Sequence, residues 1–148
     1  MIRPASRPRR YGPAIILLFT AFLAGCGSGL YPVEGQIVWK DGAPAKELAG
    51  SLVIFELPEK QTSARGVIQP DGSFRLTTNK PDDGAPAGEY KVLLIEVGRK
   101  PQGGADASVL APGVIDTRYS DLSTSDLQAT VRPGTNKITL IIERNPRR

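Results

Sequence analysis

The sequence predicts an all-β sandwich, and three observations support this fold class. The chain of 148 residues contains 16 glycines and 13 prolines, and both residue types break helices. From residue 33 onward, short runs of β-branched and aromatic residues alternate with clusters of turn residues. No stretch keeps a helical periodicity, and the single helical turn that we expect lies around residues 120–125.

Seven apolar runs are expected to be the strands of this sandwich. Within them every second residue is apolar, so the apolar residues share one face of each strand and point to the core. In the fifth run Leu93 and Ile95 interrupt this alternation, which predicts a central strand covered on both faces. The runs are 33–39, 51–57, 65–69, 73–78, 89–97, 127–132 and 137–143.

The predicted core is large enough to stabilise the chain without a disulfide. Each buried apolar side chain contributes about 1.5–3 kcal/mol. Trp39, in phase with its apolar neighbours, is assigned to the core, with an exposed stacking platform as the alternative. The core positions are Val33, Ile37, Trp39, Val53, Phe55, Leu57, Phe74, Leu76, Tyr90, Val92, Leu94, Leu127, Ala129, Val131, Ile138, Leu140 and Ile142.

Three turn sequences separate strands of the sandwich. Residues 70–73 read Pro-Asp-Gly-Ser, in which proline fixes φ, aspartate caps its own turn and glycine adopts a positive φ. Residues 40–44 repeat this chemistry, and residues 132–136 join the last two strands. The glycine- and proline-containing stretch 98–113 is expected to be the site of variable function, because long loops carry function more often than strands do.

The first 25 residues have the pattern of an export signal. Four arginines precede an apolar run over residues 14–23, which is too short to span a bilayer. Leu23, Ala24 and Gly25 followed by Cys26 resemble the bacterial lipobox, in which the cysteine is diacylated and the chain is cut just before it. Cys26 is the one cysteine of the chain. We therefore expect a lipid anchor at Cys26, and the alternative is a free thiol behind an uncleaved segment.

Charge and composition exclude several function classes. Four of the 19 basic residues lie before residue 26, which leaves 15 bases against 15 acids in the rest of the chain. Nucleic acid is rejected as a partner, because its binding needs clustered and uncompensated Lys and Arg. The chain has no histidine, which removes mechanisms that depend on a histidine base or metal ligand.

Residues 33–38 with Asp41-Gly42 and Pro44, then 53–55, 66–74 and 84–92, together resemble the carboxypeptidase regulatory-like domain of the transthyretin-like superfamily. Residues 118–121 and 124–127, followed by Val131 and Asn136, resemble the small secreted bacterial lipoproteins built on that domain. The resemblance implies a seven-stranded transthyretin-like (prealbumin-like) β-sandwich and an accessory, non-catalytic module. The hydroxyisourate hydrolases of this superfamily use histidines and end in Tyr-Arg-Gly-Ser, and this chain has neither feature.

These observations divide the chain into four parts. Residues 1–25 are the expected signal peptide, 26–32 the lipidated cysteine and a short tether, 33–143 the β-sandwich and 144–148 a disordered basic tail.

Two polar groups are candidate sites. Asp82 and Asp83 offer oxygen ligands to calcium, although Asp-Gly sequences such as 83–84 are first of all turn formers. Asp116, Arg118, Tyr119 and Asp121 form a candidate ligand surface for sugars or peptide groups. The alternative is that Tyr119 packs on the sandwich edge and Asp121 caps the following turn.

The predicted function is that of a secreted lipoprotein which presents a non-catalytic binding or structural module in the bacterial cell envelope. The lipid would hold it in the outer membrane or on the periplasmic face of the inner membrane, and no cofactor is expected. An envelope protein or a glycan is the expected partner. The alternative is a calcium-dependent glycan or peptide binder, or a weak hydrolase that uses residues 98–121.

Overall fold

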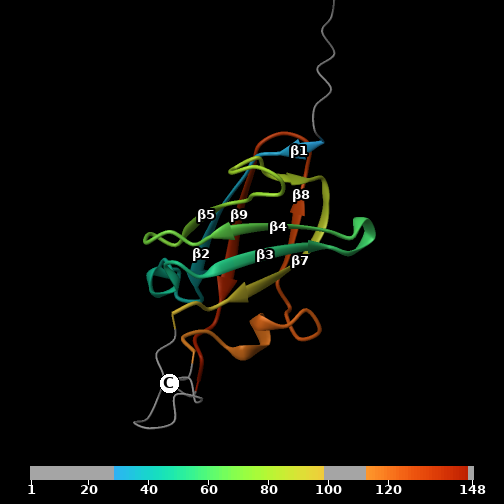
Figure 1. Ribbon diagram of the computed structural model, residues 1–148. Helices are drawn as coiled ribbons and strands as arrows, with labels where there is room; N and C mark the ends of the chain where they lie inside the picture. Colours follow the sequence, from blue (N-terminus) through green and yellow to red (C-terminus); the bar gives the residue numbers. More distant parts are fainter. Residues whose placement is uncertain (1–28, 99–112, 147–148) are drawn as a thin grey trace, which may run out of the picture.

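The computed structural model describes residues 29–98 and 113–146 as an all-β, sandwich-like fold (Figure 1). A three-stranded sheet has the order β5-β2-β9, a four-stranded sheet has the order β4-β3-β7-β8, and β1 pairs with β6. The strands are β1 (Leu30–Tyr31), β2 (Val33–Trp39), β3 (Leu52–Leu57), β4 (Thr62–Val67), β5 (Ser73–Arg75), β6 (Ala85–Pro86), β7 (Gly88–Ile95), β8 (Gln128–Val131) and β9 (Asn136–Ile142).

Each of the seven predicted runs overlaps one of these strands. The structure differs from the prediction in the segments that precede or connect the runs. β1 and β6 were not predicted, and β1 lies within the segment 26–32 expected to be a tether. The described part contains no α-helix, and its helical turns are the 3₁₀ segments η1 (Lys46–Leu48), η2 (Pro58–Lys60) and η3 (Thr117–Ser120). The expectation of a single helical turn at 120–125 is therefore wrong in number, since three 3₁₀ segments form and the nearest, η3, ends at Ser120. Residues 121–125 form a hydrogen-bonded turn, in which the amides of Thr124 and Ser125 donate to the carbonyl of Asp121.

β2 and β9 form a parallel pair in the three-stranded sheet, in which β9 is an edge strand. Their register runs without interruption from Val33 opposite Asn136 to Trp39 opposite Ile142. The other strand pairs are antiparallel. The parallel pair brings together two strands that lie far apart in the sequence, and it places β2 between β5 and β9.

The core fills the space between the two main sheets. Phe55 of β3 lies at its centre, with its ring centroid 5.9 Å from that of Phe74 in the opposite sheet and 5.7 Å from that of Tyr90. All predicted core residues are buried except Ala129 and Ile138, which are partly buried against the core. β7 is central, as predicted, but Leu93 and Ile95 on its outer face are only half-buried.

The predicted turns are present, and two of them join strands that belong to different sheets. In the 70–73 turn, Asp71 Oδ1 accepts hydrogen bonds from the Ser73 amide (2.9 Å) and hydroxyl (2.6 Å), and Gly72 has a φ of +82°. In the 40–44 turn, Asp41 Oδ1 accepts from the amide of Ala43 at 2.9 Å. The first of these turns joins β4 to β5, and the 132–136 turn joins β8 to β9, so each connects the two main sheets.

Trp39 lies in the core, as expected, but its two polar neighbours were not anticipated. The residue is 2% exposed, and its indole Nε1 donates a hydrogen bond to Glu47 at 3.1 Å. The guanidinium of Arg144 lies over the ring, 4.0 Å from the centroid, and also bonds Glu47 at 3.0 Å. Part of the segment 144–148, expected to be a tail, therefore packs against the sandwich.

Burial of Trp39 predicts its fluorescence, since it is the one tryptophan of the chain. We expect a blue-shifted emission maximum that acrylamide quenches weakly in the folded protein, and a red-shifted, readily quenched emission in 6 M guanidinium. Emission near the maximum of free tryptophan in the folded state would contradict the core assignment.

Gly35 is a second test of the packing. A Cβ atom at this position would lie 2.0 Å from the ring of Phe74, so the ring packs directly on the glycine. We expect Gly35→Ala to lower the free energy of unfolding by about 3 kcal/mol, because overpacking forces side chains out of their rotamers. Thr139→Ala, on the exposed face of β9, is the control and is expected to change it by less than about 0.5 kcal/mol. Urea titrations of the three proteins give the comparison.

Candidate functional site

The four residues of the candidate ligand surface lie in the stretch 113–127, which precedes β8 of the four-stranded sheet and forms hydrogen bonds both with β7 and with the residue that follows β9. At one end of this segment, the amide of Asp116 donates to the carbonyl of Glu143, directly after β9. At the other end, the amide of Val92 in β7 donates to the carbonyl of Leu127 at 3.0 Å. The hydroxyl of Ser125 also donates to the carbonyl of Val92. The segment therefore closes one end of the sandwich (Figure 1).

Tyr119 is buried at this closure. It is 2% exposed and belongs to the core cluster, which agrees with the alternative that it packs on the sandwich edge. Its hydroxyl oxygen accepts hydrogen bonds from the amide of Glu143 at 3.2 Å and from Arg118 Nη2 at 3.1 Å. The aromatic face expected to receive a ligand is thus covered, and only the hydroxyl reaches the polar edge.

A charged network surrounds this hydroxyl. The carboxylate of Glu143 lies between Arg118 Nη2 and Lys40 Nζ, each at 2.8 Å, and Arg118 Nη1 is 4.0 Å from Asp126. Hydrogen bonding and charge from Lys40, and then from Arg118, hold the pKa of Glu143 below its usual value. The same contact with Glu143 raises the pKa of Lys40. Sequence reasoning missed Glu143 and Lys40, because nothing local connects them to Arg118.

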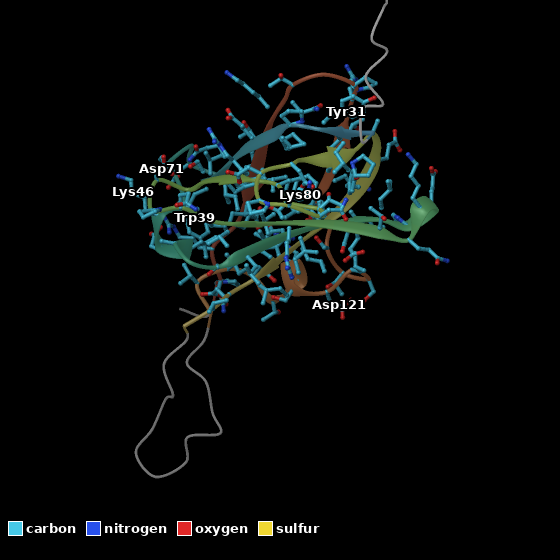
Figure 2. All side chains as sticks on the ribbon, turned by 45° about the horizontal axis from the view of Figure 1, so that its top comes forward. Tyr31, Trp39, Lys46, Asp71, Lys80 and Asp121 are labelled. Carbon is cyan, nitrogen blue, oxygen red and sulfur yellow. The ribbon has the colours of Figure 1, made fainter. Side chains whose placement is uncertain are left out.

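The two aspartates of the candidate surface hold the backbone of their own segment. Asp116 Oδ1 accepts from the amide of Arg118 at 3.0 Å and caps η3. Asp121 Oδ1 accepts from the hydroxyl of Ser123 at 2.6 Å and from its amide at 2.7 Å, which lowers the pKa of Asp121. Asp121 thus caps the following turn, and in Figure 2 it lies at the lower margin of the sandwich, apart from Trp39. A ligand surface at these four residues stays a prediction.

The calcium candidates Asp82 and Asp83 differ in their surroundings. The carboxylate of Asp83 accepts hydrogen bonds from the amides of Thr78 (2.7 Å), Asn79 (3.0 Å) and Lys80 (2.8 Å). Burial raises the pKa of Asp83, but these bonds outweigh it and the pKa is lowered. Asp82 is exposed and has a φ of +58°. Within residues 29–98 and 113–146, no three acidic, histidine or cysteine side chains come close enough to hold a metal.

A pocket that the sequence did not indicate lies between β4 and β5. Its volume is about 860 Å³, and its lining includes Leu52, Arg65, Val67, Arg75 and Asp82. None of these residues stands in a recognisable motif. The strands that supply them are consecutive in the chain but belong to different sheets, so only the tertiary structure defines the pocket.

The predicted lipidation site lies outside the described residues. This applies to Leu23, Ala24, Gly25 and Cys26, and also to residues 99–112 of the expected functional loop. In the part of the chain that the structure describes, no helix has the length and apolar character needed to cross a membrane.

Comparisons with known proteins show distant structural similarity to β-sandwich proteins. No family model matches the chain, and no curated protein matches it. A DUF3823 family protein from Parabacteroides merdae aligns with 78% of this chain and 46% of its own, at 13% identity and a TM-score of 0.41. The major pilin subunit BcpA of Bacillus cereus aligns with 78% of this chain and 30% of its own, at 14% identity and a TM-score of 0.42.

A 9R-lipoxygenase from Cyanothece aligns with 77% of this chain and 16% of its own, at 16% identity and a TM-score of 0.39. The chain thus spans less than half the length of each of these three proteins. The comparisons assign no family.

The charged network predicts how stability depends on pH. Because the pKa of Glu143 is lowered in the folded state, its ionised form stabilises the fold above the unfolded-state value of 4.5. That contribution is lost as the pH falls through the lower folded-state pKa. We expect Glu143→Gln to lower the free energy of unfolding at pH 7, and the difference from wild type to shrink as the pH approaches 3.

Denaturant titrations between pH 7 and pH 3 measure this difference. Glu59→Gln is the control, since Glu59 is exposed and forms no ion pair with any described residue. A Glu143→Gln deficit that stays constant down to pH 3 would show that the ion pairs do not cause it.

Proposed function

We propose that this protein is an exported bacterial lipoprotein, anchored through Cys26, whose β-sandwich is a non-catalytic binding or structural module of the cell envelope. The observation that carries the proposal is the order of three features. A basic, then apolar segment ends in Leu23-Ala24-Gly25-Cys26, and strand structure begins at Leu30, four residues after the cysteine. Two acyl chains anchor a protein stably where one gives only marginal binding.

The architecture of the body suits a module held close to a membrane. Its first strand pair, β1 with β6, fixes Leu30 opposite Pro86 and so ties the start of the described chain to the sandwich. Only residues 27–29 separate Cys26 from this strand. A lipid at Cys26 would therefore hold the β1 end of the sandwich near the bilayer surface.

Family membership is a finer part of the same proposal. We propose that the sandwich is a transthyretin-like domain related to the carboxypeptidase regulatory-like modules. Its support is the pair of strand orders, β5-β2-β9 and β4-β3-β7-β8, together with the segments at 33–38, 71–74 and 84–92 that resemble those modules. Such modules are accessory domains, which agrees with a non-catalytic role.

The arrangement of polar groups also favours a non-catalytic role. Tyr119 and Asp121 of the candidate surface form the hydrogen bonds that close and cap their own segment. Arg118 is paired with Glu143, and its pKa is raised by its hydrogen bond to the Tyr119 hydroxyl. These groups stabilise the closure of the sandwich, which is a structural role.

The anchor is tested by intact mass and by detergent partitioning of the full chain expressed in a bacterial host. For wild type we expect a chain that starts at Cys26 and carries acyl groups, and that enters the detergent phase of Triton X-114. Cys26→Ser is expected to keep residues 1–25, and Ser28→Ala is expected to behave as wild type. An intact N-terminus or an unmodified thiol at Cys26 in the wild-type protein would overturn the proposal.

A further inference from the structure

The hairpin formed by β4 and β5 opens at its middle. At one side, Arg65 and Thr77 exchange two backbone hydrogen bonds of 2.9 and 2.8 Å. At the other side, the amide of Gln69 donates to the carbonyl of Ser73 at 2.7 Å. Midway between the Arg65–Thr77 pair and the Gln69–Ser73 pair, two residues from each, Val67 would face Arg75 in a continuous antiparallel ladder. The two strands are not paired there, because β4 stays with β3 and β5 stays with β2.

Two backbone amides at this opening lie outside the hydrogen-bonded ladders of the two main sheets. The amide of Ile68 donates to Ser51 beside β3, and the amide of Leu76 donates to Val33 in β2. Because bonding directions alternate along an antiparallel strand, Val67 and Arg75 direct their amides toward the gap between β4 and β5. The carbonyl of Val67 accepts from Gln69 Nε2 at 3.2 Å. β4 and β5 are not paired in a sheet, and the bridge between the two segments is at Arg65 and Thr77 rather than at Val67 and Arg75.

Gly66 shows that the opening is built into the packing. A Cβ atom at Gly66 would lie 2.6 Å from the carbonyl oxygen of Arg75, so the carbonyl of β5 rests against the glycine of β4. A larger residue at this position would push the two strands apart. The glycine therefore allows the Arg75 carbonyl to lie close to β4. The backbone hydrogen bonds between Val67 and Arg75 are nevertheless not formed.

Two guanidinium groups stand over the same opening. Arg65 and Val67 lie two residues apart on β4 and oppose Thr77 and Arg75, so these side chains share one face of the hairpin. Arg75 forms an ion pair with Glu34 at 2.9 Å. Arg65 is exposed and forms no ion pair with any described residue. Both arginines line the pocket of about 860 Å³ between β4 and β5.

We propose that this pocket binds the carboxylate of a small organic acid. The guanidinium fork of Arg65 matches the two oxygens of a carboxylate, and unpaired backbone amides are the other donors that such oxyanions use. Leu52 and Val67 line the same pocket and offer apolar contact to the hydrocarbon part of the acid; Val67 is 50% exposed. The inference goes beyond the proposed anchor and does not depend on Cys26.

Asp82 is expected to make the pocket select ligands by their charge. Asp82 lines the pocket together with Arg65, so a second negative charge on the ligand would be repelled. The site should therefore prefer a monocarboxylate such as hexanoate to a dicarboxylate such as succinate. Acetate, which lacks the apolar part, should bind more weakly than hexanoate.

The experiment is a titration of the full-length protein in detergent with hexanoate, acetate, succinate and inorganic phosphate. Calorimetry gives the affinities, and ¹⁵N NMR tests whether the amide signals of Val67 and Arg75 shift. We expect Arg65→Gln to weaken hexanoate binding about tenfold, as for the loss of one charge-assisted hydrogen bond. Arg132→Gln makes the same change of charge at an exposed residue outside the pocket and is expected to leave binding unchanged.

A second variant tests the selectivity. Asp82→Asn keeps a residue type that tolerates a positive φ and is expected to raise the affinity for succinate several-fold relative to hexanoate. The proposal is overturned if hexanoate does not bind at millimolar concentration, or if Arg65→Gln binds it as tightly as wild type. Phosphate binding as tight as that of hexanoate would overturn the assignment to an organic acid.

Discussion

The parallel pairing of β2 with β9 is the constraint on which the rest of the structure depends. It joins strands about a hundred residues apart, and closing so long a loop costs conformational entropy before any contact is gained. Burial of Ile37, Trp39 and Ile142 on the inner side of the pair offsets that cost. The pair is extended at one end by the Lys40 to Glu143 ion pair. At the other end, the amide of Asn136 donates to the carbonyl of Pro32 at 2.9 Å.

The charged residues nearest to the β2–β9 pair form ion pairs with one another that stabilise the fold. Glu143 follows β9 directly, and it links Lys40, which follows β2, to Arg118 on the closing segment. Its backbone amide also donates to the hydroxyl of Tyr119. One residue thus connects the end of the parallel pair in one sheet to the stretch 113–127, which forms hydrogen bonds with β7 of the other sheet. In contrast, Arg65 lies at the other edge of the sandwich, where the hairpin opens, and no carboxylate of the described residues neutralises it.

Local sequence signals gave reliable predictions wherever the determining contacts are local. The alternation in residues 33–39 predicted the whole of β2, and Asp71 with Gly72 predicted their turn, because a period of two and an Asx turn involve only neighbouring residues. The alternative given for Asp121, as the cap of its own turn, was right for the same reason. Glu143 could not be identified as a partner of Arg118, since they lie 25 residues apart and meet only through the fold.

The sequence by itself determined where the seven strands of the two main sheets lie, which face of each is apolar and where the chain turns. These properties follow from side-chain alternation and from the conformational preferences of Gly, Pro and Asp within a few residues. Only the tertiary structure decided which sheet each strand joins, and hence that β4 and β5, consecutive in the chain, separate between Val67 and Arg75. The reason is energetic: each strand pairs where its apolar face is best buried, and that burial depends on residues from the whole chain.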